Sequence, residues 1–142
     1  QRLHDEGHDA LVEPFILGHD IEVSVITRDG APLILPSHIV EQADPAALRT
    51  YAEKRDLAET QAYAIQPLED LALAAVAEAR ARRLFREYAP FDYGRFEFRL
   101  DVRTGEILFL EVNLNCNLWS RKTIALAAAR LGWSHADLVE TI

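Results

Sequence analysis

The chain has 142 residues and a formal net charge of −8, with 49% hydrophobic and 27% charged residues, values typical of one globular domain that can bury a core. The acidic balance and the lack of a basic patch argue against nucleic-acid binding, and no apolar run approaches the roughly 20 residues of a membrane span. Cys116 is the only cysteine, which suits a reducing cytoplasm. Because the sequence begins at Gln1 and contains no methionine, we expect it to be part of a longer protein.

The first half of the chain predicts a pair of strands followed by a helix. An apolar stretch at 11–17 precedes Asp20–Ile26, whose alternating acidic and apolar residues are typical of a half-buried strand. The turn signal at 27–32 predicts that Leu33–Leu35 returns beside it. Residues 46–60 have helical propensity after an Asp-Pro start, although their apolar period is weak.

The second half predicts a helix, a hairpin and two further helices. Residues Pro67–Ala89 form an amphipathic pattern with Leu71, Val76 and Leu84 on one stripe. Two strands follow, at Arg95–Val102 and Glu106–Asn113, then a helix capped by Ser120 that ends at Leu131, and a last helix opened by a capping box at Ser134–Asp137. We therefore expect one α+β domain over residues 1–142, with a mostly antiparallel sheet backed by helices.

The hairpin sequence predicts a register that brings two carboxylates together. A three-residue loop at 103–105, ending in glycine, sets Glu97 opposite Glu111 and Arg95 opposite Asn113. One face then carries Arg95, Glu97, Arg99, Asp101, Ile107, Phe109, Glu111 and Asn113, and the other, apolar face carries Phe96, Phe98, Leu100, Val102, Leu108, Leu110 and Val112.

Two carboxylates in direct opposition repel each other, so a cation must compensate them. Mg²⁺ suits this position, because it prefers oxygen ligands and takes one or two carboxylates together with substrate phosphates. Asn113 adds an amide oxygen on the same face. The alternative is a solvated ion-pair ladder in which Arg95 or Arg99 neutralises Glu97 and Glu111, and spacing alone favours it slightly.

The stretch "GRFEFRLDVRTGEILFLEVNLN" resembles the C-terminal part of the ATP-grasp fold, in the D-alanine–D-alanine ligase-like branch. That branch has Gly-Arg-x-Asp on one strand and Glu-x-Asn on the next. The resemblance implies that Glu97, Glu111 and Asn113 are magnesium ligands and that Arg95 is catalytic, near the transferred phosphate. Glu97 replaces the usual aspartate and is one carbon longer.

A second match lies upstream, in "LVEPFILGHDIEVSVI". It resembles the family's hinge, in which one acid lies near adenine and a second binds the ribose hydroxyls. The resemblance implies that Glu13 and Asp20 have these roles and that the backbone of Pro14, Phe15 and Ile16 lines the adenine pocket. Without the downstream motif, Glu13 and Asp20 would be interpreted as exposed acids at a strand end.

Three further residues have two interpretations each. "TYAEKRD" resembles the family's Tyr-x-x-Lys segment, so Lys54 either approaches the phosphates or is a solvated lysine on a helix. "LNCNLWS" stands where the family has a Pro-Gly loop that holds the acceptor, so D-alanine is not implied as the substrate. Asn115 and Asn117 either bind substrate or shape this loop, and Cys116 between them is interpreted as a structural thiol.

The resemblance implies an ATP-dependent carboxylate–amine ligase that works through an acyl-phosphate. Its cofactors would be ATP and Mg²⁺, its partners small carboxylate and amine substrates, and it could form a homodimer. We expect the chain to be the C-terminal part of the fold, without the N-terminal lobe and glycine-rich loop, and inactive alone. The alternatives are a non-catalytic module that binds nucleotide and Mg²⁺, and an interaction domain that binds neither.

Overall fold

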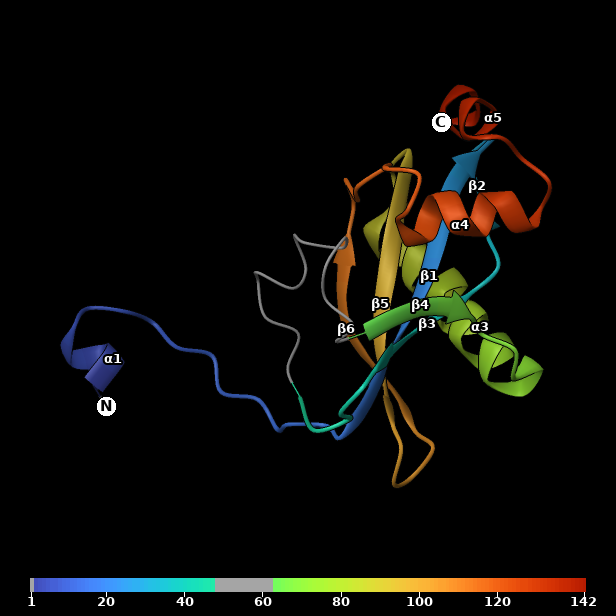
Figure 1. The fold of residues 1–142 in the computed structure, drawn as a ribbon. Coiled ribbons are helices and arrows are strands. Elements are labelled where there is room, and N and C mark those ends of the chain that lie inside the picture. The colour runs from blue at the N-terminus through green and yellow to red at the C-terminus, as the bar shows by residue number, and fades with distance from the viewer. Residues whose placement is uncertain (1, 48–62) are drawn as a thin grey trace.

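The computed structural model describes residues 2–47 and 63–142. These residues form a six-stranded antiparallel sheet in the order β4-β3-β1-β5-β6, with β2 also paired to β1 (Figure 1). The strands are β1 (Gly18–Arg28), β2 (Ala31–Ile34), β3 (His38–Gln42), β4 (Tyr63–Pro67), β5 (Tyr93–Asp101) and β6 (Ile107–Asn113), and the helices are α1 (Arg2–Asp5), α3 (Leu71–Tyr88), α4 (Thr123–Arg130) and α5 (His135–Thr141). The expected α+β fold with an antiparallel sheet is confirmed.

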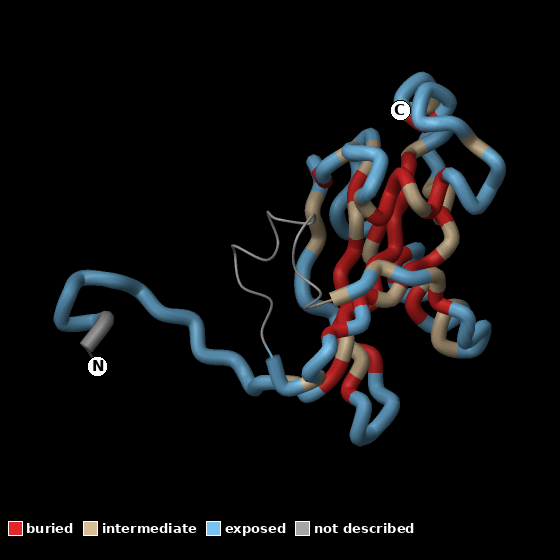
Figure 2. Tube along the Cα trace, in the orientation of Figure 1, coloured by how far each residue is buried: buried red, intermediate tan, exposed pale blue. Residues whose placement is uncertain are grey.

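Strand β1 lies in the middle of the sheet and both of its faces are covered. Ile21, Val23 and Val25 join the hydrophobic core beneath α3, whereas Ile26, on the opposite face, packs in a second core with residues of α4. Figure 1 shows the two helices on opposite sides of β1, and Figure 2 shows the buried residues concentrated along the central strands. Because side chains alternate along a strand, the face that carries Ile26 also carries Glu22.

Helix α3 begins later than the pattern predicts. Asp70 caps it, because its carboxylate accepts hydrogen bonds from the backbone N–H groups of Ala72 (2.9 Å) and Leu73 (3.0 Å). Pro67, the expected start, ends strand β4 instead. The predicted stripe is only partly correct, because Leu84 packs against the core but Leu71 and Val76 are exposed. The buried residues of the helix are Ala77, Ala81 and Phe85, four residues apart.

Of the two last helices, α4 differs from expectation and α5 begins as predicted. α4 begins at Thr123, three residues after the predicted cap. The capping box of α5 is confirmed, because Ser134 Oγ accepts from the N–H of Asp137 and the Asp137 carboxylate accepts from the N–H of Ser134. Within the described ranges, none of the helices has the length and apolarity needed to cross a membrane.

The hairpin of β5 and β6 has the predicted register at its carboxylate end only. Glu97 lies opposite Glu111 as expected. Between Glu97 and the next residue the register shifts by one, so that Phe98 pairs with Phe109. A β-bulge of this kind leaves one residue of β6 without an opposite partner.

The loop length explains the shift. The backbone N–H of Asp101 donates to the Glu106 carbonyl oxygen (2.8 Å), so the loop consists of residues 102–105 and is one residue longer than the predicted 103–105. The longer loop displaces the pairing by one, and the bulge at Leu110 restores it before Glu111.

Because of the shifted register, several residues of the hairpin lie on the opposite face from the one predicted. Ile107 and Phe109, expected on the polar face, lie on the apolar face: Ile107 is in the core and the Phe109 ring is 5.8 Å from that of Phe98. Leu110 and Val102, expected in the core, are 49% and 45% exposed. The polar face beside the carboxylates is therefore shorter than the alternation predicted.

Gly18 provides a test of how tightly β1 and β5 approach. Its φ is +152°, and a Cβ at this position would overlap the backbone carbonyl oxygen of Leu100 on β5. Gly30 also has a positive φ (+75°), but a Cβ there would meet open space. We expect Gly30→Ala to lower the free energy of unfolding by about 1–2 kcal/mol, the cost of placing an L residue at a left-handed φ. Gly18→Ala should lower it by clearly more, because its Cβ would meet the β5 backbone. Denaturant unfolding measures both, and equal losses would contradict the close approach.

Candidate functional site

The predicted polar residues of β5 and β6 line one cavity, of about 290 Å³, on the sheet face covered by α4. Six residues singled out from the sequence contribute to it: Arg95, Glu97, Glu111, Asn113, Asn115 and Asn117. Glu22, Ile65, Cys116, Lys122 and Thr123 complete its walls. Strands β1, β4, β5 and β6 and the start of α4 therefore meet at one polar hollow.

Three carboxylates form a row across neighbouring strands in this cavity. Glu22 of β1 lies opposite Glu97 of β5, and Glu97 lies opposite Glu111 of β6. Glu22 and Glu97 are 2% and 4% exposed, whereas Glu111 is exposed. The row continues to His38 of β3, whose pKa is lowered by burial. Two buried acids side by side require a positive charge close to them.

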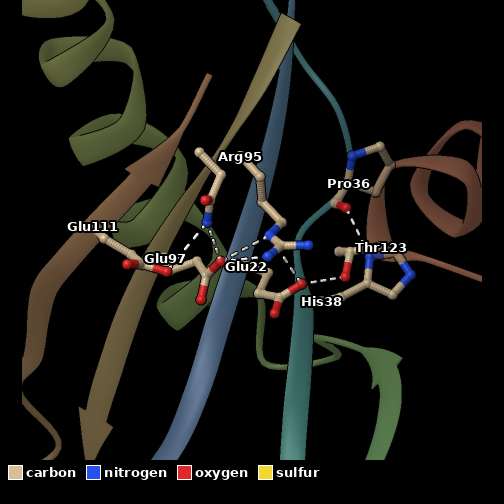
Figure 3. A network of polar contacts seen from close by, with 8 residues as sticks. Glu22, Pro36, His38, Arg95, Glu97, Glu111 and Thr123 are labelled. Atoms are coloured by element: carbon tan, nitrogen blue, oxygen red, sulfur yellow. Dashed lines mark hydrogen bonds and ion pairs between the residues drawn. The ribbon is translucent and has the colours of Figure 1, made fainter. Parts of the chain in front are cut away.

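Arg95 supplies this charge. Its Nε donates to Glu97 Oε1 (3.1 Å), its Nη2 also donates to Glu97, and its Nε lies 3.4 Å from Glu22 Oε2 (Figure 3). Burial alone would lower the pKa of the guanidinium, but the negative charges of Glu22 and Glu97 more than offset it, so the pKa is raised. Arg95 is therefore firmly cationic, and two strands share it.

Asn113 joins the two acids of the hairpin. Its side-chain Nδ2 donates to Glu97 Oε1 (2.7 Å) and to Glu111 Oε1 (3.2 Å). The amide and the guanidinium together hold Glu97, as the ion-pair alternative requires. The same contacts are expected of a metal site without its ion, since a carboxylate pair must find donors elsewhere.

We tested whether these side chains suit Mg²⁺. Among residues 2–47 and 63–142, no group of three or more His, Cys, Asp or Glu side chains is arranged to hold a metal ion. Mg²⁺ does not require such a cage, since it commonly combines one or two carboxylates with substrate phosphates and water. Glu97 and Glu111 give hard carboxylate oxygens beside a cavity. Asn113 would add its amide oxygen once its side-chain amide rotates, because its Nδ2 faces both acids in this structure. The donor set fits Mg²⁺ together with a phosphate ligand.

The predicted nucleotide-binding residues of the N-terminal segment lie apart from the cavity. Residues 8–17 have no regular secondary structure, and the start of the chain extends away from the sheet (Figure 1). Glu13 and Pro14 are exposed. Lys54 lies outside the described residues. The predicted roles of these residues stay predictions, and none of those that the structure describes lines the cavity.

Asp20 and Arg99 connect that segment to the sheet. Asp20 is 8% exposed and accepts a hydrogen bond from Arg99 Nη1 (2.9 Å), so the alternative of an exposed strand-end acid is wrong for Asp20. Arg99 Nε donates to the Ile16 carbonyl oxygen (3.0 Å), and its guanidinium lies over the Phe15 ring, 5.8 Å from the centroid. This ion pair fixes the end of the predicted adenine-binding stretch.

The loop after Asn113 is shaped by its own asparagines. Asn115 Oδ1 accepts from the Tyr93 hydroxyl (2.7 Å), and Asn117 Oδ1 accepts from the backbone N–H of Trp119 (2.8 Å). Cys116 between them is 5% exposed, and burial raises the pKa of its thiol to about 11 although Arg95 opposes this effect. These contacts support the loop-shaping interpretation, while substrate contact by the asparagines stays a prediction.

Sequence reasoning missed Glu22 and Thr123. The Thr123 hydroxyl donates to Glu22, and both side chains are buried (Figure 3). The signal was present in "DIEVSVI", where Asp20, Glu22 and Ser24 recur with the period of one strand face. The pattern could not show which residue lies opposite Glu22, because its partner Glu97 is 75 positions further along the chain.

Comparisons with known proteins show the family of this chain. Residues 1–142 match the family described as D-ala D-ala ligase C-terminus. The chain is 31% identical over 134 residues to the D-alanine–D-alanine ligase of Bordetella petrii, covering 94% of this chain and 40% of that one. It is 30% identical over 132 residues to the ligase of the same name from Carboxydothermus hydrogenoformans, covering 93% and 41%. The chain thus spans about 40% of the length of these relatives.

Solved structures share the fold at lower identity. The D-alanine–D-alanine ligase of Bacillus anthracis complexed with ATP aligns with a TM-score of 0.67 and 19% identity, covering 90% of this chain and 38% of that one. The VanG D-Ala:D-Ser ligase of Enterococcus faecalis aligns with a TM-score of 0.67 and 15% identity, covering 89% and 36%. At these identities the likeness shows the fold alone.

The buried pair of Asp20 and Arg99 gives a stability prediction. Asp20→Asn leaves the guanidinium of Arg99, whose side chain is 7% exposed, without its carboxylate. We expect the free energy of unfolding to fall by about 3 kcal/mol. The matched control is Glu69→Gln in the exposed pair of Glu69 and Arg130, where the loss should stay below about 1 kcal/mol. Similar small losses in both variants, measured by denaturant unfolding, would contradict the importance of the buried pair.

The Cys116 thiol gives a reactivity prediction. Its pKa is raised from 9.0 to about 11 by burial, so at pH 8 the thiolate fraction is about 100-fold smaller than in the unfolded chain. We expect a disulfide reagent to label the native protein at least that much more slowly than the protein in denaturant, with the rate rising as the pH approaches 11. Equal rates in both states would show that the thiol is exposed and ordinary.

Proposed function

The chain belongs to the D-alanine–D-alanine ligase C-terminal family, and on that premise we propose that it forms the magnesium- and phosphate-binding end of an ATP-dependent carboxylate–amine ligase. In this proposal it is the C-terminal part of a longer protein whose preceding part supplies the rest of the nucleotide site and the first substrate site. The fragment by itself does not ligate.

The observation that carries the proposal is the meeting of Arg95, Glu97, Glu111 and Asn113 in one cavity. A purely structural ion-pair ladder needs no hollow beside it, whereas phosphoryl transfer needs space for phosphate groups next to a fixed cation. The cavity is polar and its acids come from opposed strand positions. Its acids lie on paired neighbouring strands, which supports a role in positioning, the main task of the protein in phosphoryl transfer.

The proposed reaction has two steps. A carboxylate oxygen of the first substrate attacks the γ-phosphorus of ATP, the bond to the bridging oxygen breaks, and ADP leaves with an acyl-phosphate formed. The amine nitrogen of the second substrate then attacks the acyl carbon and loses a proton, and inorganic phosphate leaves as the amide forms. The residues of this chain act by binding and orientation, without a covalent bond to substrate.

Arg95 has the central electrostatic role in this proposal. Its guanidinium is cationic at every relevant pH, and within the described part of the chain its Nη1 donates no hydrogen bond, unlike its Nε and Nη2. That nitrogen can donate to an oxygen of the transferred phosphoryl group and stabilise charge that develops there. Glu97, Glu111 and Asn113 would hold Mg²⁺, which when bound neutralises phosphate charge and orients the phosphates.

The acceptor amine would lie near the loop at residues 114–120. This loop contributes Asn115, Cys116 and Asn117 to the cavity wall, and it differs from the Pro-Gly loop of the family. Relatives of this fold carry names with different acceptors, D-alanine in one and D-serine in another. We therefore propose a small amino acid as the acceptor class and leave D-alanine as one member of it.

The experiment uses the full-length protein that contains this chain. With ATP, Mg²⁺ and a panel of amino acids that includes D-alanine and D-serine, we expect release of ADP and phosphate and formation of a dipeptide. Binding of ATP without turnover would support a non-catalytic nucleotide module instead. No Mg²⁺-dependent ATP binding at all would support an interaction domain.

Glu111→Gln separates the metal site from the ion-pair ladder. Because Glu111 is exposed, the free energy of unfolding should change by no more than ~0.2–1 kcal/mol. We expect Mg²⁺-dependent ATP binding, followed by calorimetry, to be lost together with turnover, since a charged ligand is removed. Glu106→Gln, an exposed acid of the same hairpin, is the control and should keep both. Normal Mg²⁺-dependent binding in Glu111→Gln would overturn the assignment.

A further inference from the structure

The buried acid Glu22 has no role in the proposed chemistry so far, yet it lies at the floor of the cavity. It is 2% exposed, and its position on β1 faces Glu97 across the strand pair. A buried carboxylate costs several kcal/mol of desolvation unless its oxygens find donors. A carboxylate at this buried position therefore needs specific hydrogen-bond donors or a cation next to it.

Two of those partners come from different parts of the fold. Thr123, the first residue of α4 and fully buried, donates its hydroxyl hydrogen to Glu22 Oε2. Arg95 Nε, on β5, lies 3.4 Å from the same oxygen. Figure 3 shows the carboxylate between the hydroxyl and the guanidinium. Glu22 thus links a helix and two strands at the position where the guanidinium enters the cavity.

Glu97 cannot hold Arg95 by itself in the proposed enzyme. Its Oε1 accepts from Arg95 Nε, from Arg95 Nη2 and from Asn113 Nδ2. If Glu97 serves as a metal ligand, its negative charge is shared with the cation and its hold on the guanidinium weakens. Glu22 is buried, is bound by Thr123 and takes no part in that ligand set, so its carboxylate stays available to Arg95.

We propose that Glu22 is a positioning residue that keeps the Arg95 guanidinium aimed into the cavity while Glu97 is engaged by the metal and phosphates. The inference rests on the proposed function, because that function places a phosphate group beside Arg95. In this proposal Thr123 also has a role, because its hydroxyl binds the Glu22 carboxylate from α4 while Arg95 approaches it from β5. Glu22 does not touch the reacting atoms.

The first test observes Arg95 directly and does not depend on turnover. In full-length protein labelled with ¹⁵N-arginine, the Nε–H resonance of Arg95 is assigned by its loss in Arg95→Lys. We expect Glu22→Gln and Glu97→Gln each to retain slow exchange of this proton with water, and the double variant to exchange at least tenfold faster. If the single variant Glu97→Gln already loses slow exchange, the inference is wrong, because Glu22 would then not hold the guanidinium.

The second test uses kinetics. A misplaced group near the reaction can cost roughly 10²-fold in rate, so we expect Glu22→Gln to lower kcat by about that factor and to leave the KM for ATP within about threefold. Glu22→Asp, which retains the charge one carbon shorter, should recover part of kcat. Glu78→Gln, the same change on α3 at a side chain bonded to Ser37, is the control and should match wild type.

The outcomes separate the two proposals. If the wild-type protein ligates and Glu22→Gln keeps its kcat, the inference is wrong and the proposed function stands. If the wild type does not ligate, the proposed function is wrong and the Arg95 resonance decides whether Glu22 holds the guanidinium. If Glu22→Gln does not fold, Thr123→Val removes the hydroxyl donor without changing an acid, and it should lower kcat in the same direction without raising the KM for ATP. An unchanged kcat in Thr123→Val would overturn the inference.

Discussion

The sharing of one guanidinium by two buried acids organises this molecule. Glu22 and Glu97 lie opposite each other on β1 and β5, and without Arg95 their charges would push the two central strands apart. Glu22 also binds the start of α4, because it accepts a hydrogen bond from the Thr123 hydroxyl. One face of β1 is apolar and holds α3, while the other changes from acid at Glu22 to apolar at Ile26 and holds α4. The site therefore shares one face of β1 with the second core, and the core beneath α3 lies on the opposite face.

The β-bulge at Leu110 gives the site its sharp boundary. Up to Phe109 the hairpin alternates as a core element, with Ile107 and Phe109 packed on the aromatic residues of β5. One extra residue then returns the register, so that Glu111 meets Glu97 and the strand leaves the core to form the cavity wall. Bulges commonly re-aim side chains next to active sites, and here the bulge separates the apolar part of β6 from its polar end.

The second ion pair, of Asp20 with Arg99, lies one step along the same face and serves the other end of the domain. Arg99 binds the Ile16 carbonyl oxygen and covers the Phe15 ring, so a buried charge on the sheet fixes where the irregular N-terminal stretch leaves it. Two arginines on β5, four residues apart, thus orient two different regions. Arg95 is directed to the cavity and Arg99 to the stretch that precedes β1.

The sequence by itself determined the fold class, the family and the register that sets Glu97 opposite Glu111 and Arg95 opposite Asn113. The alternation along the strands and the two motifs are local patterns, and a local pattern can be recognised from the sequence without a structure. The tertiary structure alone decided which acid stands beside Glu97, because Glu22 reaches it through a strand pairing that no short pattern encodes. It also decided the faces of Ile107 and Phe109, because a loop one residue longer than predicted reversed their alternation. The order of the strands and the register of each pair depend on packing across the whole sheet. A local sequence pattern does not contain this information.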